Sequence, residues 1–210
     1  MLYLLHGYSD DVTAWSAIGR ANVILDNLIA RKQATPMIVV MPLGYGTMDV
    51  VRGGWGRVRD TELWQRNVDK FGDALLNEVM PQVEKSYRTV NKPESRAIAG
   101  LSMGGTESLM VGLNHLDRFA WVGAFSSGGL NTNFVENFPK LDDKANSSLR
   151  LLWIACGKED RLIDTNRQFV EWLKSRGVRN TWTETPGTHS FRVWRRHLAA
   201  FTPLLFQEKK

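Results

Sequence analysis

The chain has 210 residues, enough for one domain with a sizeable hydrophobic core, and we expect residues 1–210 to form a single domain. Hydrophobic residues make up 43% and charged residues 23%, as in ordinary globular proteins. No apolar run approaches the ~20 residues of a membrane span. The net charge of +5 comes from scattered basic residues without a recognisable binding module, so no nucleic-acid partner is expected.

Short apolar runs alternate with amphipathic helical stripes along the chain. The predicted strands are Leu2–Leu5, Met37–Met41, Arg96–Ala99, Ala120–Phe125, Leu149–Cys156 and Asn180–Thr185. The predicted helices are Ala21–Lys32, a stripe from Val68 to Met80 that Pro81 should kink or restart, Gly104–Asn114, Ile163–Arg176 and a stripe from Phe191 to Leu205. This alternation favours a mostly parallel sheet with helices on both faces, and sites at the carboxyl ends of its strands.

Two features of the sequence concern the cellular compartment of the protein. The apolar start Met1–Leu5 has no basic residue before it, and we interpret it as a strand rather than a signal peptide. Cys156 is the only cysteine, so the chain forms no internal disulfide, and we interpret it as a small core residue. Localisation stays open.

The segment from Gly100 to Gly104 reads Gly-Leu-Ser-Met-Gly between a predicted strand and a predicted helix. This is the G-x-S-x-G nucleophile elbow of the α/β-hydrolase fold in its required setting. The turn raises the serine above the sheet at a helix N-terminus, whose dipole favours a developing oxyanion. The pattern predicts Ser102 as a nucleophile; the alternative is a glycine-rich turn with a structural serine.

A serine nucleophile needs a general base, and four histidines are available. His189 follows the last predicted strand, which matches the order Ser, Asp, His along chains of this fold. His6 also lies at a strand end and is expected to support its loop rather than transfer protons. His115 lies in a polar turn and His197 within the last helix. We therefore predict His189 as the base, with a helix-capping or structural role as the alternative.

The acid that orients the base should follow a strand between Ser102 and His189. Asp160 comes shortly after the strand that ends at Cys156, and it is the predicted acid. Glu159 and Asp164 are the alternatives. Asp142 and Asp143 lie in a Lys- and Asn-rich loop and are interpreted as surface charges.

An oxyanion hole in this fold uses two backbone N–H groups. One belongs to the residue after the nucleophile, here Met103, and the other to the loop after the fold's third strand, here beginning at His6. Tyr8 is the best candidate in that loop. No cluster with metal-ligand spacing appears, and the expected mechanism needs no metal and no cofactor.

Four motifs carry a family resemblance. They are Leu4-Leu5-His6-Gly7, Ile98 to Gly105, Ile154 to Asp160 and Gly187 to Trp194. The chain resembles the esterase-D-like α/β-hydrolases, and most of all the feruloyl and acetylxylan esterases attached to bacterial xylanases. The resemblance implies Ser102, Asp160 and His189 as a catalytic triad, with Tyr8 and Met103 N–H groups as oxyanion donors.

The chain departs from this family at its start. Family members carry two more strands before the one at Leu2–Leu5, so we expect an N-terminally short domain that lacks them. The strand Met37–Met41 would then be an apolar edge, which favours pairing with another chain. We expect a homodimer or an unusual packing arrangement to cover it.

The substrate pocket is expected among the loops near the triad. The segments Gly44–Leu63 and Ser126–Leu149 are candidates, and the candidate lining residues are Trp55, Trp64, Phe191 and Trp194. The expected function is hydrolysis of small-molecule or polysaccharide-linked esters, with feruloyl esters of plant cell-wall polysaccharide favoured. Acetylxylan or short-chain esters, an acyltransferase, and an inactive binding module are the alternatives.

Overall fold

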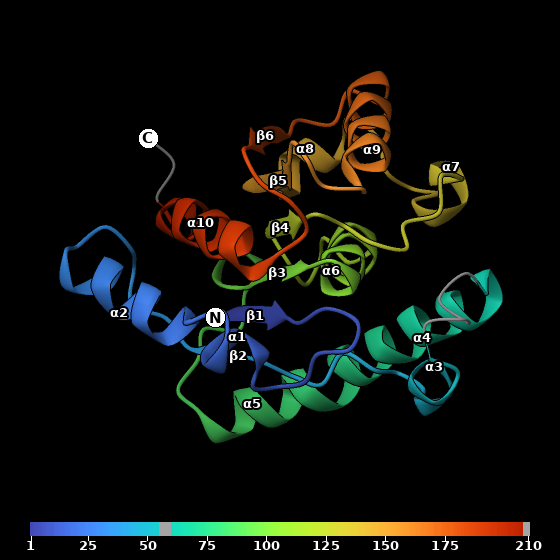
Figure 1. Ribbon diagram of the computed structural model, residues 1–210. Coiled ribbons are helices and arrows are strands. Elements are labelled where there is room, and N and C mark those ends of the chain that lie inside the picture. Colours follow the sequence, from blue (N-terminus) through green and yellow to red (C-terminus); the bar gives the residue numbers. More distant parts are fainter. Residues whose placement is uncertain (55–59, 208–210) are drawn as a thin grey trace.

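The computed structural model describes residues 1–54 and 60–207, which contain one six-stranded sheet (Figure 1). Neighbouring strands are parallel throughout, in the order β2-β1-β3-β4-β5-β6. The strands are β1 (Leu2–Leu5), β2 (Val39–Val40), β3 (Ala97–Leu101), β4 (Trp121–Phe125), β5 (Leu151–Gly157) and β6 (Thr181–Thr185). The expected parallel α/β-hydrolase sheet is confirmed.

The helices connect these strands. They are α1 (Ala14–Ala17), α2 (Ala21–Ala30), α3 (Met48–Arg52), α4 (Thr61–Ala74), a π-helical turn (Leu75–Val79), α5 (Met80–Ser86), α6 (Met103–Asn114), α7 (Phe134–Asn137), α8 (Ala145–Ser148), α9 (Ile163–Ser175) and α10 (Phe191–Phe201), with 3₁₀ turns at Pro93–Ser95 and Thr202–Leu204. The long helices lie where the apolar stripes predict them. The four- and five-residue helices were not predicted, because so short a segment shows no helical period.

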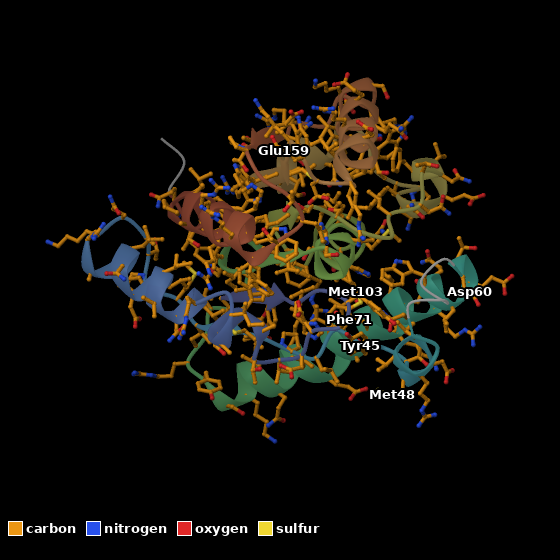
Figure 2. All side chains as sticks on the ribbon, viewed as in Figure 1. Tyr45, Met48, Asp60, Phe71, Met103 and Glu159 are labelled. Carbon is orange, nitrogen blue, oxygen red and sulfur yellow. The ribbon has the colours of Figure 1, made fainter. Side chains whose placement is uncertain are left out.

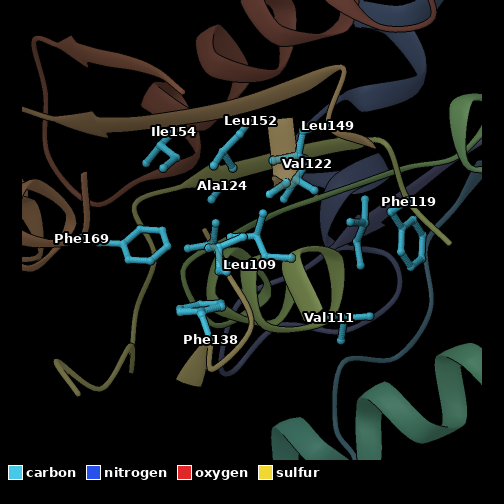
Figure 3. Close-up of a cluster of buried hydrophobic side chains, with 14 of the residues drawn as sticks. Leu109, Val111, Phe119, Val122, Ala124, Phe138, Leu149, Leu152, Ile154 and Phe169 are labelled. Carbon is cyan, nitrogen blue, oxygen red and sulfur yellow. The ribbon is translucent and has the colours of Figure 1, made fainter. Parts of the chain in front are cut away.

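Both faces of the sheet are buried, with side chains alternating between two hydrophobic clusters. Along β4, Val122 and Ala124 face a cluster with α4, α6 and α9, whereas Trp121 and Phe125 face a cluster with α1, α2 and α10. Figure 1 shows α2 and α10 on one side of the sheet and α6 and α9 on the other. Figure 3 shows the first cluster, where Leu109 of α6 packs below the sheet residues.

The strand predicted over Met37–Met41 is shorter than expected. Only Val39 and Val40 pair with β1. Pro36 and Pro42 flank the segment, and proline lacks the N–H that a strand ladder needs. The prediction was therefore wrong in length and correct in position.

Pro81 lies two residues after the end of a π-helical turn, within a helical stretch that runs from α4 to α5. Proline cannot donate a backbone hydrogen bond, and its ring clashes with the carbonyl one turn earlier. A π turn widens the helix locally and accommodates this clash. The predicted break is thus a change of helical pitch.

Two further expectations concern the core and the lipid bilayer. Cys156 is fully buried in β5, and burial raises the pKa of its thiol to about 12. It is therefore a core residue rather than a reactive thiol. Within residues 1–54 and 60–207, no helix has both the length and the apolar character needed to cross a bilayer.

The edge strand β2 generates a prediction about assembly. Its outer side has no strand partner among the described residues, and unpaired edge groups favour pairing with a second copy. We expect light scattering to give twice the chain mass of 23.8 kDa, with dissociation on dilution. A mass of 23.8 kDa at every concentration would contradict the homodimer.

Candidate active site

Ser102 lies between the last residue of β3 and the first residue of α6, at the carboxyl edge of the sheet. Its backbone adopts φ 51° and ψ −115°, a strained conformation for an L-residue. Two hydrogen bonds hold this turn: the Ser102 N–H donates to the Phe125 carbonyl (2.9 Å), and its own carbonyl accepts from the Gly128 N–H (2.9 Å). The geometry expected of a nucleophile elbow is present.

Two glycines make this turn sterically possible. A Cβ on Gly104 would lie 2.5 Å from the His6 carbonyl oxygen and 2.7 Å from the Leu5 Cβ. A Cβ on Gly100 would overlap the Gly104 carbonyl. The elbow therefore depends on close approach of three backbone segments, which only glycine allows at these two positions.

A hydrogen-bond chain joins three side chains from the ends of β3, β5 and β6. His189 Nε2 lies 2.9 Å from Ser102 Oγ, and His189 Nδ1 lies 2.8 Å from Asp160 Oδ2. Because a carboxylate only accepts, Nδ1 donates to Asp160, and Nε2 is left to accept from the serine hydroxyl. The Asp160 side chain is fully buried, whereas that of His189 is 19% exposed. These distances match the geometry expected for the predicted nucleophile, base and orienting acid.

Asp160 is held in its ionised form. Burial alone would raise its pKa, but hydrogen bonds from His189 and from the Leu162 N–H (2.9 Å) outweigh burial and lower the pKa below its usual value. A buried carboxylate with two donors can fix the imidazole tautomer and stabilise an imidazolium.

The alternative acids have other partners. Glu159 accepts a hydrogen bond from the Gly187 N–H, in the loop that carries the base. Asp164 lies on the exposed face of α9 and pairs with Arg167 at 3.3 Å. Neither carboxylate is joined to His189 by a hydrogen bond of the described residues.

The remaining histidines lie away from the serine hydroxyl. His197 is buried in α10, with Nε2 2.8 Å from Thr185 Oγ1, and burial followed by the charge of Arg196 lowers its pKa to about 4. His115 follows α6, and its carbonyl accepts from the Arg118 N–H (2.9 Å). Both lie outside the pocket beside Ser102.

His6 ties two backbone loops together. Its Nε2 accepts from the Gly44 N–H (2.9 Å), so Nδ1 carries the proton of the neutral ring and donates to the Gly7 carbonyl (2.8 Å). Burial lowers the pKa of His6, which favours the neutral ring. With both nitrogens occupied by the backbone, His6 supports its loop, as the sequence predicts.

The predicted oxyanion donors lie at either side of the elbow. Met103 is the first residue of α6, where backbone N–H groups have no partner one turn earlier (Figure 2). Tyr8 lies in the loop after β1 and lines the pocket beside Ser102. Its hydroxyl donates to the Val50 carbonyl (3.1 Å), which anchors the loop to α3.

A buried carboxyl group beside the loop after β2 was not predicted. Glu107 of α6 is fully buried, and its Oε1 accepts from Asn67 Nδ2 of α4 (3.3 Å). Asn67 Oδ1 in turn accepts from the N–H groups of Gly46 (3.0 Å) and Thr47 (3.2 Å). The sequence holds one signal for this network: Glu107 is the only ionisable residue between Met103 and Asn114.

The pocket beside Ser102 has a volume of about 360 Å³. Its aromatic walls include the candidate lining residues Trp64, Phe191 and Trp194, together with Tyr8. Trp194 contacts the base edge-on, with ring centroids 4.8 Å apart. The predicted Trp55 lies outside the described residues. Among the described residues, no group of three His, Cys, Asp or Glu side chains could hold a metal ion.

Comparison with known proteins matches residues 1–205 to the family model "Esterase", described as "Putative esterase". An "Endo-1,4-beta-xylanase/feruloyl esterase" of Xylanibacter ruminicola is 32% identical over 208 residues, which are 99% of this chain and 26% of that protein. The chain thus spans about a quarter of that relative's length. An "Acetyl esterase" of Caldicellulosiruptor saccharolyticus is 24% identical over 94% of this chain and 80% of that protein. A solved structure of a "ferulic acid esterase" is 28% identical, with a TM-score of 0.78 over 96% of this chain and 82% of that chain.

Burial of Glu107 generates a prediction about stability. Burial raises its pKa well above 4.5, so the folded protein keeps a proton that the unfolded chain loses. Relative to Glu107→Gln, the wild type should therefore lose free energy of unfolding as the pH rises above 4.5, by about 1.4 kcal/mol per pH unit until the folded-state pKa of Glu107 is reached. Glu107→Gln has no such proton, so it should gain stability relative to the wild type over this window.

Denaturant unfolding at about pH 5 and about pH 8 measures this difference. Glu78→Gln, at an exposed position, is the matched control and should follow the wild type. The same pH dependence in the wild type and in Glu107→Gln would mean that Glu107 does not hold a proton in the folded protein.

Proposed function

Since the chain belongs to the Esterase family, we propose that it hydrolyses hydroxycinnamoyl esters of plant cell-wall polysaccharide, with ferulate as the aromatic acid. Family membership and the esterase relatives make the chain a carboxylic ester hydrolase of the serine type. The feruloyl specificity is supported by two relatives whose names carry that activity. In this proposal residues 1–210 form one catalytic domain.

One observation supports the triad most directly. The side chains of Ser102, His189 and Asp160 come from three separate strand ends, yet they form one chain of hydrogen bonds of 2.8–2.9 Å. Ser102 and His189, two of these three residues, line a pocket of about 360 Å³. A structural role for a single serine would require neither the buried carboxylate nor the pocket.

Acylation begins when Ser102 Oγ attacks the ester carbonyl carbon while His189 Nε2 takes the hydroxyl proton. The carbonyl oxygen becomes an oxyanion, which accepts hydrogen bonds from the Met103 and Tyr8 N–H groups. Asp160 stabilises the imidazolium. The tetrahedral intermediate collapses, the bond to the alcohol breaks, and His189 gives its proton to the leaving oxygen.

Deacylation repeats these steps with water. His189 takes a proton from a water molecule as its oxygen attacks the acyl-Ser102 carbonyl. The second intermediate expels Ser102 Oγ, which receives the proton back from His189. The products are a free carboxylic acid and the unchanged enzyme, and neither step needs a cofactor.

The walls of the pocket favour an aromatic acyl group. Trp64, Phe191 and Trp194 present rings to a cavity whose volume suits a small aromatic acid. Phe191 and Trp194 pack edge-on with ring centroids 5.2 Å apart, which keeps this wall rigid. An acetyl group would fill little of this volume.

Acetyl ester hydrolysis is the second candidate, because an acetyl esterase is similar over most of its own length. The triad and oxyanion donors would serve it unchanged. Transfer of the acyl group to an alcohol instead of water is a further alternative, and product analysis with an alcohol acceptor distinguishes it from hydrolysis.

Replacing the nucleophile tests the central assignment. We expect Ser102→Ala to lower kcat on methyl ferulate and on p-nitrophenyl acetate by about 10⁴-fold or more, because no other group accepts the acyl chain. Release of ferulate and of p-nitrophenolate is measured for both proteins. A higher kcat/KM for methyl ferulate supports feruloyl specificity, a preference for the acetate supports the second candidate, and equal turnover by the variant would refute the nucleophile.

Replacing Asp160 tests whether this residue orients His189 or only stabilises the fold. Asp160→Asn keeps the size of the side chain but can donate a hydrogen to His189 Nδ1, which favours the wrong tautomer. We expect kcat on the preferred ester to fall by about 10³–10⁴-fold with little change in melting temperature. The matched variant Asp164→Asn should retain activity. Full activity of Asp160→Asn would contradict the assigned role.

A further inference from the structure

A second and larger cavity lies next to the catalytic pocket. It has a volume of about 660 Å³ and lies between the first turns of α4, the middle of α6, and the segment that leads to α7. These three helices are labelled in Figure 1. Trp64 and Gly129 line both this cavity and the catalytic pocket. The two spaces therefore adjoin at one shared wall, within reach of a single extended ligand.

The lining of this cavity, here called the α4–α7 cavity, is apolar at its base and polar at its rim. The base consists of the buried side chains of Trp64, Val68 and Leu130. The rim carries exposed hydroxyl, amide and carboxyl groups, from Thr61, Glu62, Gln65, Asn131, Thr132 and Glu136. Of the described residues that line it, none is basic.

The shared wall contains a buried donor that has no partner. Trp64 is only 8% exposed, and its indole N–H makes no hydrogen bond among the described residues. The same edge of the indole packs against Gly129, where φ is +78° and a Cβ would overlap the ring. Unpaired buried donors are rare in native proteins. The contact with Gly129 covers this donor, so Trp64 offers a ligand its ring rather than its N–H.

From these observations we propose that the α4–α7 cavity binds the glycan part of the ester while the ester carbonyl lies at Ser102. This inference rests on the proposed function. Sugar rings present C–H faces that pack on Trp64 and Val68, and hydroxyl groups that hydrogen-bond to a rim of amides and hydroxyls. The carboxylates of Glu62 and Glu136 disfavour an anionic chain and favour a neutral one.

Filling the cavity from its rim tests this assignment. Gln65 lies on the exposed face of α4, where its side-chain amide donates to Asp69 Oδ1 (2.8 Å). Gln65→Trp would place a large ring over the cavity, and Thr132→Trp would do the same from the opposite wall. Arg66→Trp introduces the same ring at a neighbouring exposed position that does not line the cavity, and is the matched control.

The measurement is kcat/KM for ferulate esterified to a neutral xylo-oligosaccharide, divided by kcat/KM for methyl ferulate. We expect the wild type to prefer the oligosaccharide ester. Gln65→Trp and Thr132→Trp should each lower the ratio about tenfold, mainly through KM of the larger ester. Arg66→Trp should keep the wild-type ratio.

Several outcomes would overturn the inference. A wild-type ratio near one would mean that the glycan adds no binding. An unchanged ratio in both cavity variants would mean that the cavity is not used, and equal losses on both esters would point to the acyl group instead. If the wild type hydrolyses neither ester, the proposed function itself fails, and this inference with it.

Discussion

The crossing of β1, β3 and α6 leaves room for nothing larger than hydrogen at Gly100 and Gly104, and the site is built outward from that contact. The Gly104 N–H donates to the His6 carbonyl (3.1 Å), so the start of α6 is tied to the end of β1. His6 extends this connection to Gly44 in the loop after β2, and Glu107 extends it through Asn67 to Gly46 in the same loop. The strained serine, the loop with Tyr8 and the loop after β2 are therefore one connected unit.

The His189 ring is held from two directions, which is the geometry that preorganised catalysis requires. Asp160 fixes one ring nitrogen of His189, while Trp194 packs edge-on against the ring. Trp194 is itself fixed, because its indole N–H donates to Ser126 Oγ (3.2 Å). Phe125, one residue before that serine, packs against Trp15, Trp153 and Phe201, so the aromatic core anchors this support.

The sequence predicts the sheet, the long helices and the three residues at the strand ends, because hydrophobic period and chain order are local signals. It does not predict how far β2 extends. The pairing of β2 with β1 is limited by Pro36 and Pro42 and by the short length of β1. It also misses the contact between Glu107 and Asn67, which lie 40 positions apart and meet only through the packing of α4 on α6. The α4–α7 cavity is likewise defined by elements distant in sequence, so no spacing rule reveals it.

The order of the parallel strands has a consequence for how the chain reaches its native state. Parallel neighbours cannot form as local hairpins, and each pairing closes a long loop before it gains any contacts. The residues of the site follow the ends of β1, β3, β5 and β6. Along the chain they are spread from His6 to His189. A partly folded chain therefore contains helices and collapsed core but no assembled hydrogen-bond chain. Recovery of turnover during refolding will report completion of the whole sheet, later than any spectroscopic signal for helix.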